Sequence, residues 1–369
     1  MKNRKPLLFS PLIVLLLSII MIGGCKKEED TNTPSACANG VKDGDETGVD
    51  CGGSCNACTG ADIYIVGNEF NGASTVAKCW KNGIEVNLTG ANNARAYSVF
   101  VANNDVHIVG DNYYSTFASY WKNGIPVNMF STSSSSKAED VYVSGTDVYI
   151  AGSSTSYFAT YWKNGTEIHL TDGNHYAQAT GVYVSGNDVY ICGTENTNTK
   201  RVAKYWKNGV AVTLSDTNNL ADAYDIFVQG NDVYVAGSEV IDGWGFPQYL
   251  TAKYWKNGNP ISLNDGTLYS AEAFSIAVSG NDVYVAGFSE SSGIMKAVLW
   301  KNGTETTLPI GNSPGSANSI AVSGNDVYAA GSEPNGSFMA AKYWKNGMPV
   351  IVSDTTKNMS ATSIFIVAH

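Results

Sequence analysis

Histidine, arginine and charge of either sign are scarce in this sequence of 369 residues. Of its four histidines, His107 and His169 fall in expected strands and His369 ends the chain, which leaves His175 in an expected loop. A cluster of histidine metal ligands is therefore not expected. The sequence also lacks a nucleophile elbow, a His-Glu-x-x-His motif and a phosphate-binding loop. It offers no recognisable set of catalytic residues.

Positive charge is especially low. The chain has 23 lysines and arginines against 33 aspartates and glutamates, and Lys2, Arg4 and Lys5 belong to an N-terminal leader. The remainder carries 20 basic and 33 acidic residues, a net charge of −13. Binding to a nucleic-acid backbone relies on clustered lysine and arginine. We therefore expect no nucleic-acid partner.

An internal repeat dominates the rest of the sequence. The phrase Trp-Lys-Asn-Gly occurs seven times, at intervals of 41 to 49 residues. Its copies begin at Trp80, Trp121, Trp162, Trp206, Trp255, Trp300 and Trp344. An apolar phrase ending in glycine precedes each copy, at Gly67, Gly110, Gly152, Gly193, Gly237, Gly287 and Gly331. The repeat predicts seven copies of one structural unit.

Each unit reads as four short strands. Segments such as 275–278, 282–286 and 261–263 are rich in residues that favour strands, and Gly, Asn, Asp and Ser occupy the joints. Asn and Gly in these joints tolerate the positive φ that tight hairpins require. Repeats of about 40–50 residues with four antiparallel strands are typical of β-propeller blades. Residues 61–369 therefore resemble seven-bladed β-propeller proteins, a resemblance that implies an all-β fold and no particular activity.

The two ends of the repeat array complement each other. The array opens with an expected second strand at residues 62–66 and ends with residues 361–367, which match the first strand of other copies. We predict that the C-terminal strand completes blade 1 as its innermost strand and closes the ring. The repeated Trp is expected to pack between blades. Cys79 and Cys192 are expected to be buried free thiols, because blades 1 and 4 lie too far apart for a disulfide.

Residues 1–24 have the features of a secretory leader. A basic start precedes an apolar run over residues 7–22, which is short for a membrane span. The run is followed by Gly23-Gly24-Cys25, which resembles a bacterial lipobox and implies acylation of Cys25. Residues 25–36 are expected to be a lipid-anchored tether, and its charged run over residues 26–30 resembles the signals of Bacteroidetes-type lipoproteins displayed on the outer membrane. A plain solvated tether is the alternative. We expect a lipid-anchored protein that faces the periplasm or the cell exterior.

Residues 37–58 form a separate small module with four cysteines, Cys37, Cys51, Cys55 and Cys58. In an exported chain these predict two disulfides, with three possible pairings. The module resembles cysteine-rich units that follow the anchor in surface proteins of such bacteria. Its carboxylates could ligate Ca²⁺, although their spacing is not that of an EF-hand. These residues are Asp43, Asp45, Glu46 and Asp50. A plain acidic turn is the alternative, and no other cofactor is expected.

Loop length varies mainly between the second and third strands of each unit. The longest such loop, in blade 5, contains Trp244, Phe246 and Tyr249, and Trp244 is the only Trp outside the repeat frame. These rings are candidates for contacting a sugar or a peptide. The alternative is a small satellite core in which they fold back on the blade.

The loops between successive units carry aspartates at matching places, each followed by an apolar residue such as Tyr176 or Leu220. We consider these aspartates as ligands for cations or sugar hydroxyls, with turn capping as the alternative. They are Asp172, Asp216, Asp265 and Asp354. The lysine of each Trp-Lys-Asn-Gly phrase is expected on the opposite face, as a solubility device or as a contact with an anionic envelope.

These features favour a non-catalytic module that binds a carbohydrate or an envelope or extracellular protein. One alternative is a polysaccharide hydrolase or lyase that uses the loop aspartates. Sialidase-like propellers rely on three arginines, and only Arg95 and Arg201 follow the leader. A second alternative is a structural component of an envelope complex.

Overall fold

A computed structural model describes most of the chain from Gly60 to His369. The described residues are 60–112, 117–130, 135–155, 157–198, 200–215, 219–241, 249–264, 270–291, 293–309, 314–352 and 356–369. The expected leader, Cys25, the tether and the cysteine-rich module lie outside them. No helix within the described ranges is long and apolar enough to cross a membrane.

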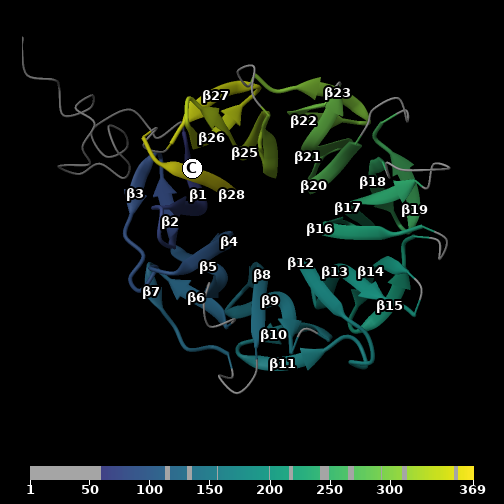
Figure 1. The fold of residues 1–369 in the computed structure, drawn as a ribbon. Coiled ribbons are helices and arrows are strands. Elements are labelled where there is room, and N and C mark those ends of the chain that lie inside the picture. Colours follow the sequence, from purple (N-terminus) through teal and green to yellow (C-terminus); the bar gives the residue numbers. More distant parts are fainter. Residues whose placement is uncertain are drawn as a thin grey trace, which may run out of the picture. The chain divides into compact units, whose positions relative to one another are not determined.

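In the described part of the chain, twenty-eight strands form seven four-stranded antiparallel sheets arranged as blades around a central axis (Figure 1). We name the strands of each blade A to D from the axis outward. Blade 1 contains β28 (Asn358–Ala368), β1 (Ala61–Phe70), β2 (Thr75–Lys81) and β3 (Ile84–Val86). Blade 2 contains β4 (Ala94–Ala102), β5 (Asp105–Asn112), β6 (Ala118–Lys122) and β7 (Ile125–Pro126). Blade 3 contains β8 (Ser136–Ser144), β9 (Asp147–Ser154), β10 (Phe158–Lys163) and β11 (Thr166–His169).

The other four blades follow in chain order. Blade 4 contains β12 (Ala177–Ser185), β13 (Asp188–Asn196), β14 (Arg201–Lys207) and β15 (Val210–Thr213). Blade 5 contains β16 (Ala221–Gln229), β17 (Asp232–Ile241), β18 (Tyr249–Lys256) and β19 (Asn259–Ser262). Blade 6 contains β20 (Ser270–Ser279), β21 (Asp282–Ser291), β22 (Ile294–Lys301) and β23 (Thr304–Thr307). Blade 7 contains β24 (Ser316–Ser323), β25 (Asp326–Asn335), β26 (Phe338–Lys345) and β27 (Met348–Ile351).

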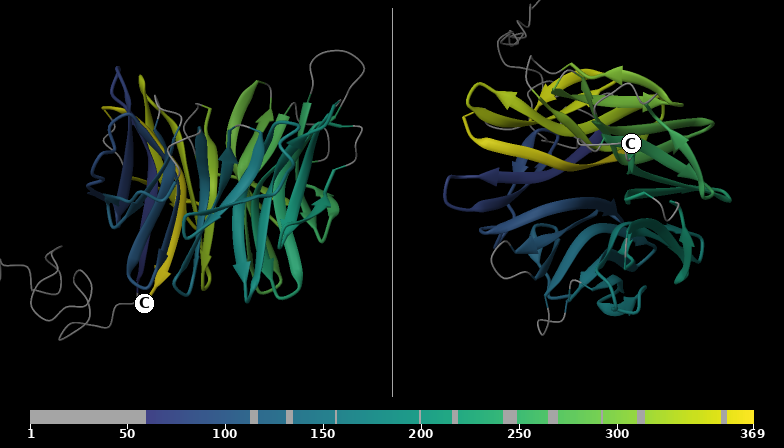
Figure 2. Two further views of the ribbon diagram at one scale, coloured as in Figure 1. Left: turned by 90° about the horizontal axis from the view of Figure 1, so that it is seen from below. Right: turned by 45° about the vertical axis from the view of Figure 1, so that its right-hand side comes forward.

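The ring closes through the two ends of the repeat array, as predicted. The C-terminal strand β28 pairs antiparallel with β1, in a register that sets Ile63 opposite Ile366. Figure 2 shows the yellow C-terminal strand beside the purple first strand. Blade 1 is thus assembled from both ends of the propeller, and the all-β, seven-bladed prediction is confirmed.

The repeated phrases of each unit form one interlocking cluster at the C–D turn. In blade 6, Asn302 and Gly303 both adopt positive φ, at 51° and 83°, as a tight type I′ hairpin requires. The Asn302 amide donates to Asp282 at 2.7 Å and its oxygen accepts the Val283 N–H at 2.9 Å. Lys301 pairs with the same Asp282 at 2.7 Å and lies over the Tyr284 ring. The cluster ties the third strand to the second.

Every blade repeats this pairing of lysine with aspartate. The pairs are Lys81–Asp62, Lys122–Asp105, Lys163–Asp147, Lys207–Asp188, Lys256–Asp232, Lys301–Asp282 and Lys345–Asp326, at 2.6 to 2.8 Å. The sequence suggested solubility or envelope contact for these lysines. The structure gives each of them a partner within its own blade.

The repeated tryptophans pack between blades, as expected. All seven are at most 2 % exposed. In the cluster that joins blades 5 and 6, Trp300 packs among residues of both blades, including Ala236 and Ala252 of blade 5. Seven such clusters fill the seven interfaces. Cys79 and Cys192 are buried free thiols in this core, which confirms that prediction.

The glycine that ends each apolar phrase lies inside strand B and not at its end. Strand β21, for example, continues through Gly287 to Ser291. A Cβ at Gly287 would lie 1.9 Å from the carbonyl oxygen of Glu272 on the neighbouring A strand. The same conflict, at 1.7 to 2.0 Å, exists at all seven glycines. Glycine is therefore required by the close approach of the A strand.

A β-bulge in strand A accompanies each of these glycines. In blade 6, Ala273 pairs with Gly287 and Ser275 pairs with Ala286, so Phe274 has no partner in strand B. The equivalent unpaired residues of blades 1 to 7 are Thr362, Tyr97, Glu139, Thr180, Tyr224, Phe274 and Asn318. A bulge redirects a side chain and bends its strand. Here it does so once per blade, on the strand nearest the axis.

In every blade except blade 4, the side chain of the residue after the bulge bonds to a neighbouring blade. Ser275 accepts the Ile320 N–H of blade 7 at 3.2 Å, and Ser319 accepts the Ile364 N–H of blade 1 at 3.2 Å. Asp225 accepts the Ile276 N–H at 2.9 Å and the Ser275 hydroxyl at 2.7 Å. The backbone donors near the bulges are therefore satisfied across the blade interfaces.

Asp140 occupies the same position in blade 3 and is half-buried there. Its carboxylate accepts three hydrogen bonds. The donors are the Ser98 hydroxyl at 2.6 Å, the N–H of the next residue, Val141, at 2.9 Å and the Val182 N–H at 2.8 Å. Burial raises the pKa of Asp140 to about 7, with a contribution from the charge of Asp225. Between these two aspartates the equivalent residue is Gly181, where a Cβ would lie 2.9 Å from the Cys192 sulfur. Blades 2, 3 and 4 are thus joined through one carboxyl group.

The first prediction concerns Gly287. Gly287→Ala places a methyl group on a backbone carbonyl that the bulge holds in place, and we expect it to lower the free energy of unfolding by about 3 kcal/mol or more. Gly60→Ala is the matched control, because a Cβ there meets no atom within 4 Å. Denaturant unfolding of both variants tests the prediction. Equal unfolding midpoints for the two variants would contradict it, because they would show that the A strand can move away from the added methyl group with little loss of stability.

The second prediction concerns pH and the Asp282 cluster. Hydrogen bonds from Lys301 and Asn302 lower the pKa of Asp282. The ionised Asp282 carboxylate therefore stabilises the folded state at pH values above the usual carboxyl pKa of about 4. This stabilisation is lost as the pH falls through the lower pKa that Asp282 has in the folded state. Asp282→Asn should reduce stability at about pH 7 and approach the wild type near pH 2. Unfolding midpoints measured at both pH values test this, and a pH-independent difference would contradict it.

Candidate functional site

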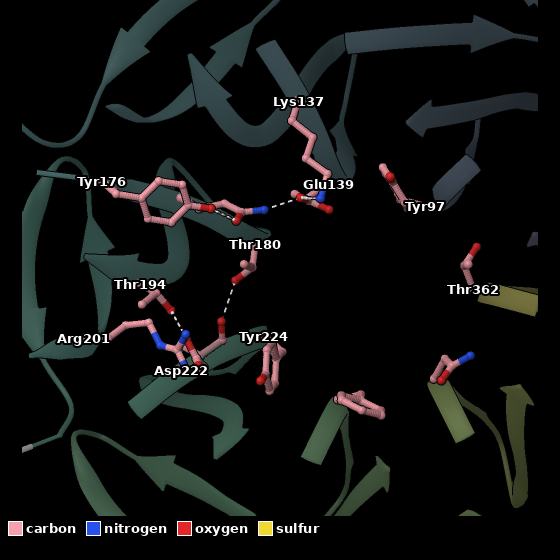
Figure 3. A pocket seen from close by; sticks show the side chains of 14 residues that line it. Tyr97, Lys137, Glu139, Tyr176, Thr180, Thr194, Arg201, Asp222, Tyr224 and Thr362 are labelled. Atoms are coloured by element: carbon pink, nitrogen blue, oxygen red, sulfur yellow. Dashed lines mark hydrogen bonds and ion pairs between the residues drawn. The ribbon is translucent and has the colours of Figure 1, made fainter. Parts of the chain in front are cut away.

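The seven bulge residues meet in one cavity of about 480 Å³ on the axis of the propeller. Figure 3 shows side chains from around the ring directed toward this space, among them Tyr97, Glu139, Thr180, Tyr224 and Thr362. Each blade contributes its own bulge residue to the lining. The pocket is therefore a direct product of the bulges.

The pocket lies at the face that carries the B–C and D–A loops. Tyr176 immediately precedes strand β12, Thr194 lies near the end of β13, and Arg201 begins β14. All three line the pocket. The hairpin turns with the lysine clusters lie at the opposite ends of the strands. The pocket thus lies at the end of the blades where the described parts of the B–C and D–A segments leave the strands.

An aromatic belt crosses the channel beyond the pocket. Three residues past each bulge, five successive blades place an aromatic ring, and neighbouring ring centroids are 4.6 to 5.0 Å apart. The rings are Phe365, Phe100, Tyr142, Tyr183 and Phe227. Ala277 and Ala321 occupy the remaining two blades. The belt separates the polar pocket from the A–B turns.

One side of the pocket is organised around Glu139. Lys137 pairs with its carboxylate at 2.5 Å, and the Gln178 amide donates a hydrogen bond to it. The Tyr176 hydroxyl in turn donates to the Gln178 oxygen at 2.8 Å. Burial raises the pKa of Glu139, and Lys137 opposes the shift. The side chain of Lys137 remains 39 % exposed, so its ammonium faces both Glu139 and the pocket.

A second ion pair stands on blades 4 and 5. Arg201 contacts Asp222 at 2.6 Å, and the Thr194 hydroxyl donates to the other carboxylate oxygen at 3.2 Å. Burial raises the pKa of Asp222, although Arg201 favours its charged form. The Arg201 side chain is 42 % exposed and that of Asp222 only 15 %. Each pair thus has a buried acid and a half-exposed base at the pocket.

Aromatic rings supply the apolar part of the lining. Tyr224 and Phe274 lie edge to face, with ring centroids 5.6 Å apart. The Tyr224 hydroxyl donates to Glu272 at 3.0 Å, which fixes the ring. The Tyr97 hydroxyl donates to Asp111 at 2.9 Å, and Lys137 lies 4.9 Å from the centre of the Tyr97 ring. The rings are therefore held in place by the scaffold.

The two ligand candidates that are described, Asp172 and Tyr249, do not line this pocket, although Tyr176, which the sequence placed after Asp172, does. Asp172 is exposed and accepts the Asn174 N–H at 3.0 Å, which is the turn-capping role that was the alternative. Tyr249 begins β18 and pairs with Ile241. The other ligand candidates lie outside the described residues; they are Trp244, Phe246, Asp216, Asp265 and Asp354. The metal candidates Asp43, Asp45, Glu46 and Asp50 also lie outside them.

Metal ligation has no site in the described part of the chain. Residues 60–369, apart from the gaps given above, contain no group of three or more His, Cys, Asp or Glu side chains placed to hold a metal ion. The carboxylates of the axial pocket are instead paired with Lys137 and Arg201.

A sequence signal for the pocket exists and was missed. In every copy of strand A an alanine precedes the bulge residue and Ser, Asp or Gly follows it, as in Ala96-Tyr97-Ser98 and Ala138-Glu139-Asp140. The alanines are fully buried. Between these constant neighbours the bulge residue changes type from blade to blade. A variable position in a constant frame marks a side chain that the fold leaves free.

Comparisons with known proteins concern the fold. No protein-family model matches the sequence, and no curated protein matches it. Among solved structures, the computationally designed Ika8 protein is similar at a TM-score of 0.40 and 17 % identity, over 71 % of this chain and 79 % of that one. The β-propeller domain of the Trilobed protease from Pyrococcus furiosus is similar at a TM-score of 0.48 and 9 % identity, over 79 % of this chain and 94 % of that one.

Proposed function

We propose that the propeller is a non-catalytic binding module that holds a carbohydrate in its axial pocket. The observation that carries this proposal is the ring of seven bulge residues. It combines three aromatic side chains, Tyr97, Tyr224 and Phe274, with carboxylate, amide and hydroxyl groups. Aromatic faces pack on the apolar faces of sugar rings, and the planar polar groups match their hydroxyls.

The shape of the pocket favours a small ligand over a protein partner. Its volume of about 480 Å³ falls in the range of roughly 300–1,000 Å³ that is usual for small-molecule sites. A stable protein interface usually covers about 800 Å² on each partner. A recess to which every blade contributes one bulge residue, with two ion pairs in its lining, suits a ligand that enters the recess.

The third prediction tests this proposal. The full chain would be titrated with soluble gluco-, manno-, xylo- and N-acetylglucosamine saccharides, and bound ligand and released products would be measured together. Tyr224→Ala should weaken binding by about tenfold or more, because it removes a fixed aromatic face. Tyr157→Ala is the matched control, since Tyr157 is 54 % exposed and lies outside the pocket.

The outcomes separate the competing interpretations. Binding that Trp244→Ala abolishes and Tyr224→Ala leaves intact would place the site in the blade 5 loop instead. The absence of binding to every saccharide, together with a co-purifying protein, would favour the structural alternative.

A hydrolase or lyase is the second candidate function. It is favoured by the raised pKa values of Glu139 and Asp222, since a carboxyl group that keeps its proton can act as a general acid. Both groups belong to strands A, and neither is one of the loop aspartates. Both also have a basic partner in contact, which suits a fixed hydrogen-bonding role. Released products in the titration would favour the enzyme.

We also propose that a lipid on Cys25 anchors the protein to the bacterial outer membrane. The basis is the lipobox-like Gly23-Gly24-Cys25 after an apolar run, together with the charged tether that follows it.

The fourth prediction concerns this anchor. Cys25→Ser should abolish incorporation of labelled palmitate and release the protein from the membrane fraction, because the acylated residue is lost. Cys79→Ser is the matched control, since Cys79 is buried in the propeller core. Metabolic labelling and fractionation of cells that express each variant would measure both effects. Persistent labelling of Cys25→Ser would contradict the anchor proposal.

A further inference from the structure

A second cavity adjoins the axial pocket on one side. It measures about 380 Å³ and lies along the B–C segment of blade 4, which includes Asn196 and Asn198, with Leu220 of blade 5 on its other wall. Tyr176 and Arg201 line both cavities. Figure 3 shows these two side chains on the same side of the axial pocket. These two side chains therefore lie between the two cavities.

The second cavity runs away from the axis. The axial pocket contains residues from the A strands of all seven blades, whereas the second cavity is lined at the end of β13 and the start of β14, the middle strands of blade 4. Leu220 lies just before β16, on the next blade. The cavity is thus a groove between blades 4 and 5 on the loop face, and it continues the axial pocket outward.

The groove is built from fixed elements. The Asn196 N–H donates to the Tyr176 carbonyl at 2.8 Å, which joins the D–A and B–C segments of blade 4. Thr197 and Lys200 close the intervening turn through two backbone-to-side-chain hydrogen bonds at 3.0 and 3.1 Å. On the facing wall, the Leu220 carbonyl accepts the Val240 N–H at 2.7 Å. A ligand would not have to order these walls, which favours binding.

The chemistry of the groove matches that of the pocket. Tyr176 is 42 % exposed, and its hydroxyl is held by Gln178, so one ring face is presented at the junction. Amide and hydroxyl groups follow along the B–C segment. Within the described residues, Asn196 Oδ1 and Arg201 Nε are buried polar atoms without a hydrogen-bond partner. Such atoms are uncommon in folded proteins, and here both belong to side chains that line the groove.

We propose that the axial pocket and this groove form one continuous site for an oligosaccharide. A sugar unit occupies the axis, and the following units pass over Tyr176 into the groove between blades 4 and 5. The inference rests on the proposed function and adds that the ligand is a chain that extends from the axis into the groove. A monosaccharide would leave the groove empty.

The fifth prediction is a dependence of affinity on chain length. The full chain would be titrated by calorimetry with saccharides of one to six units from the series that binds. The affinity should rise by about tenfold or more beyond the single unit. Asn196→Ala should remove this rise and leave monosaccharide binding close to that of the wild type. Asn198→Ala, at an exposed position in the groove, provides a second variant that does not risk the fold.

The two proposals fail in different ways. Equal affinity for short and long saccharides would overturn the groove inference and leave the axial site standing. A rise with length that neither groove variant reduces would also overturn it. If no saccharide binds, the proposed function and this inference fall together. Tyr157→Ala again serves as the control, because it alters an exposed ring of blade 3 outside both cavities.

Discussion

The structure depends on one contact that is repeated in each blade, between a glycine of strand B and a carbonyl oxygen of strand A. The carbonyl occupies the space that a Cβ would need, 1.7 to 2.0 Å from the position of that atom. This approach accompanies the bulge, and the bulge determines which side chain reaches the axis. It also places the next residue, such as Ser275 or Asp140, where it bonds to the neighbouring blade. The glycine thus links the backbone geometry of one blade to the assembly of the ring and to the pocket.

Much of the fold could be predicted from the sequence because its determinants are local and repeated. Asn302-Gly303 indicates a hairpin, an apolar phrase indicates a buried strand, and the position of residues 361–367 indicates closure. The role of Gly287 could not be predicted in the same way. Glycine is required there because the pairing of strands A and B is offset by one residue at the bulge. The run Ala273-Phe274-Ser275-Ile276 has the same apolar character with or without that offset. The constant neighbours of Phe274 and its equivalents mark a repeated position, but they do not reveal that this position is a bulge.

The candidate site escaped prediction for a related reason. Variation in loop length drew attention to the blade 5 loop and to aspartates such as Asp172, because insertions mark places that the fold does not constrain. The pocket residues lie at positions of constant spacing, where only the residue type changes. The sequence shows Tyr176 only as the apolar residue that follows Asp172. Its position at the junction of two cavities is visible only in the structure. The ion pairs of the repeated lysines were not predicted either, because their aspartate partners lie about 20 residues away in sequence, on the adjacent strand.

The seven bulge positions are equivalent in the fold and unequal in chemistry, and this inequality bears on function. A ring of seven identical side chains would present the same surface in seven orientations and would not fix a ligand that lacks such symmetry. Here the aromatic rings belong to blades 2, 5 and 6, and the hydrogen-bonding groups belong to the other four. The paired charges lie on blades 3, 4 and 5, beside the groove. A ligand in this pocket therefore meets a different partner on each side, and the groove extends from the side formed by Tyr176 and Arg201. The scaffold is symmetric because its stability comes from a repeated contact, whereas the site is asymmetric because the bulge residue differs from blade to blade.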